Sequence, residues 1–564
     1  DVSGNLKNSH APVINAKGRV NKLHFNGYDY NNILLNGAYS SQGIKGQLSM
    51  DDPNATVVLK GTMQKNKGQN DINITADFSH FCPSAMRLTN KWGDSQFKAS
   101  IRAAIKGNGL NDAMGQLTVN DFEMKGTSQN YTLNHLSFNT GYHEGQHYLT
   151  INSDFGHAEL VGRFEYASLS ESMVNFVRKQ LPTLPGLPNR QYTTNNNFLV
   201  RAEINKTDWL ERLLQVPLHA DQPITLNGKI NDKENYLYLN CIAPDIQFKD
   251  QRLRDITVAV TTPEKALHCD ISATKVMDKD NLLKVSVSGT AHDNVLNTRL
   301  HWSNTADKTF SGMLNCEANF TTEAGQQTAH IDVKPSHINI GETQWEVNPA
   351  HITYRKSHID VDNFEIRHDK QHLSVCGTAS KSEADSLQIN LNGIDVNYVL
   401  NLVNFHSVEF GGSASGRAYI TAPFSDFGAK AQLTVNRFTF EGGRMGVLQA
   451  DVEWNKAEKQ IDIKGTANDG PEAMTYIDGY VSTSRSYIDL GIRADGTRLD
   501  FMRSFTKNFM NDIGGQARGE VRLIGPLSTI NLTGQLVVDG HASITTTGCT
   551  YTLHNDTVNL IPDD

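Results

Sequence analysis

The sequence has few cysteines, no long apolar run and no cluster of basic residues. Six cysteines in 564 residues are too sparse for a disulfide scaffold. Even the closest pair, Cys241 and Cys269, is too far apart for the CxxC spacing of a zinc or redox site. We expect mostly small, buried apolar side chains here, with room for one or two disulfides.

The absence of long apolar runs and of basic runs argues against a membrane-spanning helix and against a nucleic-acid-binding protein. No stretch approaches the roughly 18 consecutive apolar residues that a membrane-spanning helix needs. The net charge is −9 and no long run of Lys or Arg occurs, so the chain lacks the basic footprint of a nucleic-acid-binding protein. A solvated, mildly acidic surface explains the charge.

Short alternating segments take the place of long helices. In residues 283–288, Leu-Lys-Val-Ser-Val-Ser, every second side chain is apolar, and residues 256–260 and 487–492 follow the same rule. This period predicts strands with one apolar and one polar face, whereas strands buried in a parallel sheet would show continuous apolar runs. The pattern predicts an all-β chain, with on the order of 35 to 40 strands.

A few short amphipathic helices are expected to interrupt the strands. The first spans residues 168–181, opens with a capping box at Ser168 and Glu171, and ends at the Pro-rich residues 181–188, which we interpret as a rigid connector. Its apolar stripe is Met173, Phe176 and Val177. The other helices are expected at residues 207–214, 395–405 and 499–509. In the last helix, Phe501, Phe505 and Phe509 recur every four residues, a pattern typical of core contacts.

Residues 143–147, His-Glu-Gly-Gln-His, match the His-Glu-x-x-His signature of zinc metalloproteases. That signature needs a helix, because positions i and i+4 then lie on one face, where two imidazoles bind one Zn²⁺ and the Glu acts as general base. Gly141 and Gly145 disfavour a helix, and the alternating residues on either side predict strands. We therefore expect His143, Glu144 and His147 to lie in a hairpin loop that holds no metal.

Internal repetition is the strongest signal of organisation in the chain. Each copy begins with an alternating strand, turns at Asp or Asn, and continues, usually through a short helix, into another strand. Three copies close on similar letters: Gly-Gln-Leu-Thr-Val-Asn-Asp-Phe at 115–122, Ala-Gln-Leu-Thr-Val-Asn-Arg-Phe at 431–438 and Gly-Gln-Leu-Val-Val-Asp at 534–539. No compositional break demands separate domains, so residues 1–564 are predicted to form one elongated β-repeat region. The repeat units span residues 71–122, 198–248, 387–438 and 487–538.

These repeats resemble a known family. Residues 514–536, Gly-Gly-Gln-Ala-Arg-Gly-Glu-Val-Arg-Leu-Ile-Gly-Pro-Leu-Ser-Thr-Ile-Asn-Leu-Thr-Gly-Gln-Leu, look like the repeat unit of the TamB family, within the wider AsmA-like proteins. Residues 27–37, 181–188 and 344–349 are similar to its Bacteroidota branch. The resemblance covers essentially the whole chain, but it rests on patterns and not on catalytic motifs.

The resemblance implies a fold, a location and partners. Such proteins form an open β-trough, the β-taco, that crosses the periplasm, and they are implicated in moving phospholipid from the inner to the outer membrane. They also act with a BamA-like barrel partner in outer-membrane protein assembly. The resemblance implies that this chain is a middle fragment. An N-terminal helix in the inner membrane would precede it, and a C-terminal domain would follow the strand at 551–558.

The one-sided apolar pattern fits such a trough. Exposing a 16-carbon acyl chain to water costs about 13 kcal/mol, at about 0.8 kcal/mol for each methylene, and a continuous apolar face removes most of that cost. The groove is expected to be lined by Ile72, Ile74, Leu149, Ile151, Ile256, Val258, Val260, Leu283, Val285, Val287, Ile389, Leu391, Leu433, Val435, Ile461 and Ile463.

Two other classes remain open. A filled β-solenoid, serving as a structural or adhesin-type surface protein without lipid cargo, shows the same alternation. A polysaccharide-active enzyme on a β-helix would need clustered carboxylates, but Asp51, Asp52, Asp451 and Glu453 form no constellation in the sequence. We therefore expect neither enzymatic activity nor a cofactor.

Overall fold

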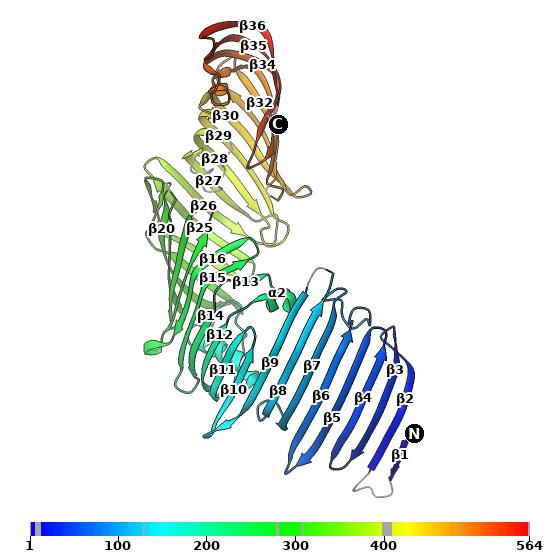
Figure 1. Cartoon of the computed structure of the whole chain (residues 1–564). Helices are drawn as coiled ribbons and strands as arrows, with labels where there is room; N and C mark the ends of the chain where they lie inside the picture. Colours follow the sequence, from blue (N-terminus) through cyan, green and yellow to red (C-terminus); the bar gives the residue numbers. More distant parts are fainter. Residues whose placement is uncertain are drawn as a thin grey trace. The chain divides into compact units, whose positions relative to one another are not determined.

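Antiparallel strands make up most of the chain (Figure 1). The computed structural model describes residues 2–5, 13–127, 130–277, 281–306, 309–396, 409–482 and 484–561. Strands account for 70% of the chain and helices for 6%, and the described residues contain 36 strands. The predicted all-β class is confirmed.

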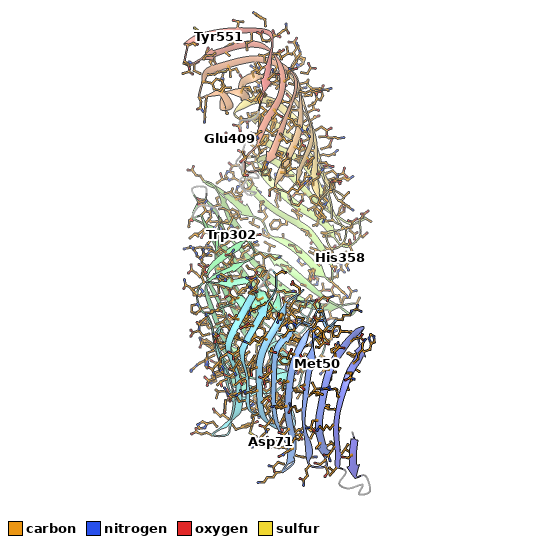
Figure 2. The ribbon with its side chains drawn as sticks, turned by 45° about the vertical axis from the view of Figure 1, so that its right-hand side comes forward. Met50, Asp71, Trp302, His358, Glu409 and Tyr551 are labelled. Atoms are coloured by element: carbon orange, nitrogen blue, oxygen red, sulfur yellow. The ribbon has the colours of Figure 1, made fainter. Side chains whose placement is uncertain are left out.

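The chain divides into two units. The N-terminal unit comprises residues 1–182 and 187–306, and the C-terminal unit comprises residues 183–186 and 307–564. In both units the side chains project from either side of the sheet (Figure 2). Each unit is described separately below.

In the N-terminal unit, consecutive strands pair antiparallel, except that β12 pairs with β14 while β13 pairs with β15. The strands are β1 (Val2–Asn5), β2 (Val13–Phe25), β3 (Tyr28–Ser40), β4 (Gly43–Asp52), β5 (Ala55–Asn66), β6 (Gln69–Phe81), β7 (Gln96–Gly107), β8 (Met114–Lys125), β9 (Asn130–His143), β10 (Gln146–Ser153), β11 (Gly156–Arg163), β12 (Asn197–Ile204), β13 (Leu218–Ala220), β14 (Ile224–Asn231), β15 (Tyr236–Phe248), β16 (Gln251–Thr261), β17 (Leu267–Val276), β18 (Leu282–His292) and β19 (Val295–Asn304).

In the C-terminal unit, β20 pairs with both β21 and β22, and from β25 onward consecutive strands pair antiparallel. The strands are β20 (Phe310–Glu323), β21 (Gln326–Val333), β22 (Ser336–Ile340), β23 (Thr343–Val347), β24 (Ala350–Arg355), β25 (His358–His368), β26 (Gln371–Ala379), β27 (Ser386–Asp395), β28 (Phe410–Thr421), β29 (Gly428–Phe440), β30 (Gly443–Asn455), β31 (Gln460–Asn468), β32 (Met474–Ser482), β33 (Tyr487–Arg498), β34 (Met510–Pro526), β35 (Asn531–Ile544) and β36 (Cys549–Leu560).

Two-residue turns that end in glycine join many of these strands. Asn26 and Gly27, between β2 and β3, have φ angles of 51° and 72°. Positive φ at both turn positions defines the type I′ turn, whose twist matches that of the strands it joins. The β29–β30 turn repeats this geometry at Glu441 and Gly442, with φ of 48° and 71°.

The helices agree only in part with the sequence predictions. Helices α1 (Leu169–Gln180) and α2 (Asp208–Leu214) are confirmed. The capping box at Ser168 is wrong, because the Ser168 side chain makes no cap hydrogen bond to the helix and its Oγ donates to the Glu165 carbonyl instead. The helix expected at 395–405 lies almost entirely outside the described residues. The described residues also contain three 3-10 turns: η1 (Tyr166–Ser168), η2 (Pro263–Lys265) and η3 (Leu499–Phe501).

The last predicted helix is shorter than expected. Turn η3 leads into α4 (Met502–Thr506), so the helical stretch covers residues 499–506. Phe501 is buried, as a core contact should be, but Phe509 lies beyond the helix and is 49% exposed. The expectation that Phe509 continues the apolar stripe is wrong, because the chain turns at residues 507–509 and enters β34.

The repeat units place similar elements in similar order. The first unit runs through β6, β7 and β8, with turns between β6 and β7. The second has α2 between β12 and β14, and the fourth has residues 499–506 between β33 and β34. In the third, the insertion between β27 and β28 falls largely on residues 397–408, outside the described part of the chain. Each insertion therefore follows the first strand of its repeat.

Candidate functional site

One row of residues crosses thirteen strands of the N-terminal unit on a single face. Directly paired residues of antiparallel strands share a face, so the face can be followed from partner to partner. We call this series the apolar row: Ile74, Ala103, Leu117, Phe138, Ile151, Ala158, Ala202, Leu226, Cys241, Val258, Ile271, Val287 and Leu300. Every member is apolar. With strands about 4.8 Å apart, the row extends about 60 Å along the sheet.

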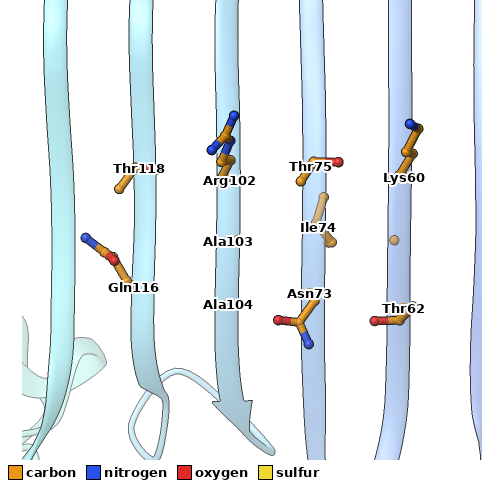
Figure 3. A pocket seen from close by; sticks show the side chains of 11 residues that line it. Lys60, Thr62, Asn73, Ile74, Thr75, Arg102, Ala103, Ala104, Gln116 and Thr118 are labelled. Carbon is orange, nitrogen blue, oxygen red and sulfur yellow. The ribbon is translucent and has the colours of Figure 1, made fainter.

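The neighbouring row on the opposite face is polar at all but one position, Ile242. Figure 3 shows this face on β5–β8, where Thr75, Arg102 and Thr118 of the row lie side by side with Lys60 of β5. We call this series the polar row: Thr75, Arg102, Thr118, Ser137, Asn152, His157, Glu203, Thr225, Ile242, Thr257, Ser272, Ser286 and His301. The two faces are therefore chemically distinct along twelve of the thirteen strands, β15 being the exception.

No member of the apolar row is fully buried. Ile74 is 37% exposed and Ile271 is 40% exposed, and the other members are half-buried. The central row of a packed β-sandwich would be buried against an opposing layer. This apolar face is instead accessible along its middle.

The predicted groove residues of the N-terminal unit all lie on this face. Ile74, Ile151, Val258 and Val287 belong to the apolar row itself. The rest lie two or four positions from a row member along the same strand, and therefore on the same face: Ile72, Leu149, Ile256, Val260, Leu283 and Val285. Sequence reasoning missed Leu117, Phe138, Ile271 and Leu300, although the first two lie in alternating segments of the kind that we used elsewhere.

One edge of this face is covered. Phe198, Ile230 and Leu237 lie on it at the strand ends and are buried. Helix α1 lies against these ends, because Ser172 donates a hydrogen bond to Asp232 and Asn196 donates one to Ser172, at 2.9 and 2.7 Å. The helix closes an edge of the apolar face and leaves its middle open.

The C-terminal unit has a corresponding apolar face. The row that contains Leu391 and Leu433 is apolar or glycine on all twelve strands that it crosses: Ile366, Leu373, Leu391, Gly416, Leu433, Ala450, Gly465, Ile477, Ile492, Val521, Gly534 and Leu560. The other predicted groove residues here, Ile389, Val435, Ile461 and Ile463, share the same face.

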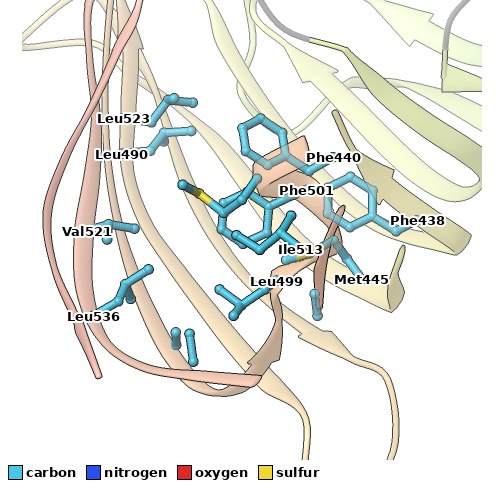
Figure 4. Packing of buried hydrophobic residues seen from close by; sticks show 14 of the residues in the cluster. Phe438, Phe440, Met445, Leu490, Leu499, Phe501, Ile513, Val521, Leu523 and Leu536 are labelled. Atoms are coloured by element: carbon cyan, nitrogen blue, oxygen red, sulfur yellow. The ribbon is translucent and has the colours of Figure 1, made fainter. Parts of the chain in front are cut away.

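Part of this face is filled between β28 and β36, although most of the row, including Leu433 and Ile477, stays half-buried. Leu499, Phe501 and Met502, from the segment of residues 499–506, pack with Phe438 and Leu523 into one buried cluster (Figure 4). The sheet curls strongly here, since Cα atoms of β30 and β33 come within 8 Å although β31 and β32 separate them in the sheet. Val435 is therefore a core residue, only 5% exposed, and is not accessible as a groove residue.

Backbone contacts hold the 499–506 segment in place. A Cβ atom on Gly443 would lie 2.2 Å from the Phe501 nitrogen, so glycine is needed at this close approach. The Ser504 hydroxyl donates to the Glu441 carbonyl at 3.0 Å, and Arg503 Nε donates to the Ile513 carbonyl at 3.2 Å. The segment thus joins the β29–β30 turn to β34.

The His-Glu-x-x-His residues do not form a helical zinc site. Glu144 and Gly145 make a two-residue turn, His143 ends β9, and His147 lies inside β10, so the loop assignment is wrong for His147. Across this turn His147 pairs with Tyr142 and His143 pairs with Gln146, which places the two imidazoles on opposite faces of the sheet. They cannot bind one ion together.

His147 belongs to the edge of the apolar face. Its ring stacks between Tyr142 and Phe164, with centroid distances of 4.9 and 4.4 Å, and its Nε2 lies 2.9 Å from the Thr140 hydroxyl. Burial lowers the pKa of His147, which favours the neutral ring. His143 and Glu144 extend into solvent.

The cysteines differ from expectation. All six are free, five are half-buried and Cys549 is exposed. No disulfide forms among them, and the assignment of the cysteines as buried core residues is wrong, because Cys241 and Cys269 lie on the accessible apolar face. Burial raises the pKa of both thiols.

Three of the four scattered acids, Asp52, Asp451 and Glu453, have structural partners. Burial alone raises the pKa of Asp52, but hydrogen bonds from Tyr28, Asn54 and Asn31 outweigh it and hold that pKa below its usual range. Glu453 pairs with Lys430 at 2.8 Å. In the part of the chain that the structure covers, no three His, Cys, Asp or Glu side chains gather to hold a metal. No helix there is long and apolar enough to cross a membrane.

Comparisons with known proteins found no matching family model, no matching curated protein and no matching solved structure.

Proposed function

We propose that this chain carries the acyl chains of phospholipid along its apolar face, as part of a bridge between the inner and outer membranes. One observation supports this function most directly. The apolar row runs without a polar interruption across thirteen strands, yet none of its members is fully buried. A surface of that kind is unusual in a monomer and marks an interaction site for an apolar partner.

The energetics favour a long, narrow ligand. Half-buried side chains such as Phe138 and Val287 retain apolar area that a ligand can cover, and each 100 Å² removed from water stabilises a complex by about 2.5 kcal/mol. The row has no polar group that would fix one ligand position along it. A lipid chain could therefore shift from strand to strand at similar free energy.

Location and partners rest on the resemblance to the TamB and AsmA-like proteins. We place the chain in the periplasm, anchored in the inner membrane by a helix outside this sequence. A BamA-like outer-membrane barrel is the proposed protein partner, through a further domain, and support of outer-membrane protein assembly is the accompanying role.

The filled region favours a second candidate. The cluster around Phe501 and Leu523 is packed like an ordinary core, which is what a structural or adhesin-type β-solenoid needs throughout. Under that alternative, the accessible face of the N-terminal unit would not bind lipid.

Site-specific photo-crosslinking separates the two candidates. Benzoylphenylalanine placed at Val285 or Val258, both on the apolar face, should capture phospholipid in cells. The matched positions are the adjacent residues Ser286 and Thr257, which belong to the polar row and should capture none. Mass spectrometry of the crosslinked chain identifies the lipid. Equal labelling from both faces, or no lipid from either, contradicts lipid carriage and favours the structural candidate.

A further inference from the structure

An arginine of helix α1 has buried nitrogen atoms without hydrogen-bond partners. Arg178 lies in the last turn of α1, and its Nε and Nη2 atoms are both buried and unpaired. The carbonyl groups at the end of the helix therefore do not accept from these two atoms. Buried guanidinium nitrogens are almost always paired, because leaving them unpaired costs free energy. In this conformation both atoms are closed to solvent, so a partner from outside the chain reaches them only when the side chain turns toward open space.

Arg178 lines a cavity of about 810 Å³ beside α1. The other lining groups are largely polar and come from α1 and from the residues that precede β12, among them Asn175, Gln191 and Thr193. The volume falls within the range of small-molecule sites. Amides and hydroxyls around a cation suit a ligand that carries hydroxyl groups as well as negative charge.

The charges of the cavity leave a positive surplus. Lys179 lines it beside Arg178, and Asp232 is the one carboxylate among its lining residues. Asp232 Oδ2 already accepts hydrogen bonds from Ser172 Oγ at 2.9 Å and from the Asn196 backbone at 2.6 Å. One cation of the two is therefore not neutralised within the cavity.

We propose that this cavity binds a phosphate ester, and that the Arg178 guanidinium turns from its buried position toward the cavity to become the main contact. The planar fork of arginine matches two oxygens of a phosphate group, and Lys179 adds a second positive charge. The polar lining then faces the alcohol part of the ester. A free metabolite such as a glycerol phosphate and the headgroup of a phospholipid both present this chemistry.

The headgroup source rests on the proposed lipid function, since α1 borders the apolar face, whereas the free-ester source does not. The test begins with thermal unfolding in phosphate-free buffer, with glycerol, sn-glycerol 3-phosphate or inorganic phosphate added. We expect saturable stabilisation by the two phosphates and none by glycerol. Arg178→Met should weaken the response to the phosphates about tenfold or more, as expected for charge-assisted hydrogen bonds.

Two control variants make the result specific. Arg201→Met removes an arginine of β12 that lies on the opposite face from Ala202 and outside the cavity lining, and it should respond like the wild type. Arg178→Lys keeps the charge without the fork and should bind several-fold more weakly. Without ligand, Arg178→Met should unfold at the same or a higher temperature, because a buried unpaired charge is removed. A purely structural arginine would give a lower temperature.

A photo-crosslinker at Gln191 identifies the source. Capture of phospholipid there assigns the site to a headgroup, and stabilisation by glycerol phosphate without lipid capture assigns it to a free ester. Capture of lipid at Val285 tests the acyl-chain proposal separately, so the two can fail independently. An unchanged response in Arg178→Met, or no response in the wild type, overturns the phosphate site.

Discussion

The apolar faces of the two units have the same sequence pattern and different surroundings. In the N-terminal unit the apolar row from β6 to β19 has no fully buried member. In the C-terminal unit part of the face between β28 and β36 packs into a core in which Leu523 and Leu536 are 1% and 2% exposed, while other positions of the same face, such as Leu433 and Ile477, stay half-buried. Alternation therefore determines which face is apolar, but it does not determine whether that face is covered.

Two segments that pack on these faces, residues 499–506 and helix α1, account for the difference in burial. Residues 499–506 lie on the apolar side of the C-terminal sheet and contribute Leu499, Phe501 and Met502 to its core. In the N-terminal unit, α1 covers only the strand ends through its contacts with Asn196 and Asp232. Where residues 499–506 pack on the face no room for a ligand remains, whereas a cover at the strand ends leaves the face accessible.

The largest expected effect comes from placing a charge in each face. Leu523→Asp should destabilise the C-terminal unit by about 4 kcal/mol or more, because the carboxylate would be buried without a partner. Val285→Asp should cost only about 1–2 kcal/mol, because water reaches the half-buried position. Denaturant unfolding, monitored by hydrogen exchange, measures the free energy of unfolding of each unit separately.

Val285→Asp should also abolish lipid capture by a crosslinker at Val258 while the chain remains folded. Comparable destabilisation by the two substitutions would remove the distinction between an accessible and a filled face.

Much of this arrangement follows from local sequence. The two-residue period assigned all sixteen groove candidates to the apolar faces, because side-chain direction in a strand depends only on position along it. Burial of Val435 does not follow from local sequence, since it depends on Phe501 and Leu499, more than sixty residues later. Arg178 was missed for a related reason, because only the fold shows that its nitrogens are buried.

Truncation of a large side chain gives the next largest effect. Phe501→Ala should destabilise the C-terminal unit by about 3–5 kcal/mol, through lost burial and the cavity that remains. Phe138→Ala, in the accessible row, should cost about 1–2 kcal/mol, because its side chain is only half-buried. Urea unfolding of the two variants tests the difference. A Phe138 variant as unstable as the Phe501 variant would indicate that the N-terminal face is covered after all.

Cysteine alkylation should show a smaller difference. Burial raises the pKa of Cys241 in the apolar row, so less of it is thiolate at pH 8 and it should react more slowly with iodoacetamide than the exposed Cys549. Added phospholipid should slow Cys241 further and leave Cys549 unchanged. Single-cysteine variants with the other five replaced by serine allow each rate to be measured by mass. A Cys241 rate that does not respond to lipid argues against acyl chains on this row.

The smallest effect concerns two matched ion pairs, one in each unit. In the N-terminal unit, Arg252 donates to both Asp245 oxygens at 2.8 and 2.7 Å, and in the C-terminal unit Arg522 donates to both Asp489 oxygens at 2.5 and 2.7 Å. The hydrogen bonds from Arg252 hold the pKa of Asp245 below its usual range. A carboxyl whose pKa is lower in the folded state stabilises that state above its unfolded pKa of about 3.9, and this contribution disappears as the pH falls through the folded pKa.

Arg252→Gln should therefore return the pKa of Asp245 toward its usual range and make the stability of the N-terminal unit less dependent on pH in acid. Arg522→Gln, the same change in the other unit, should leave Asp245 unaffected. Carboxyl NMR titration measures both variants, and an Asp245 that titrates at its ordinary pH in the wild type would show that the pair contributes nothing to the acid stability of this unit.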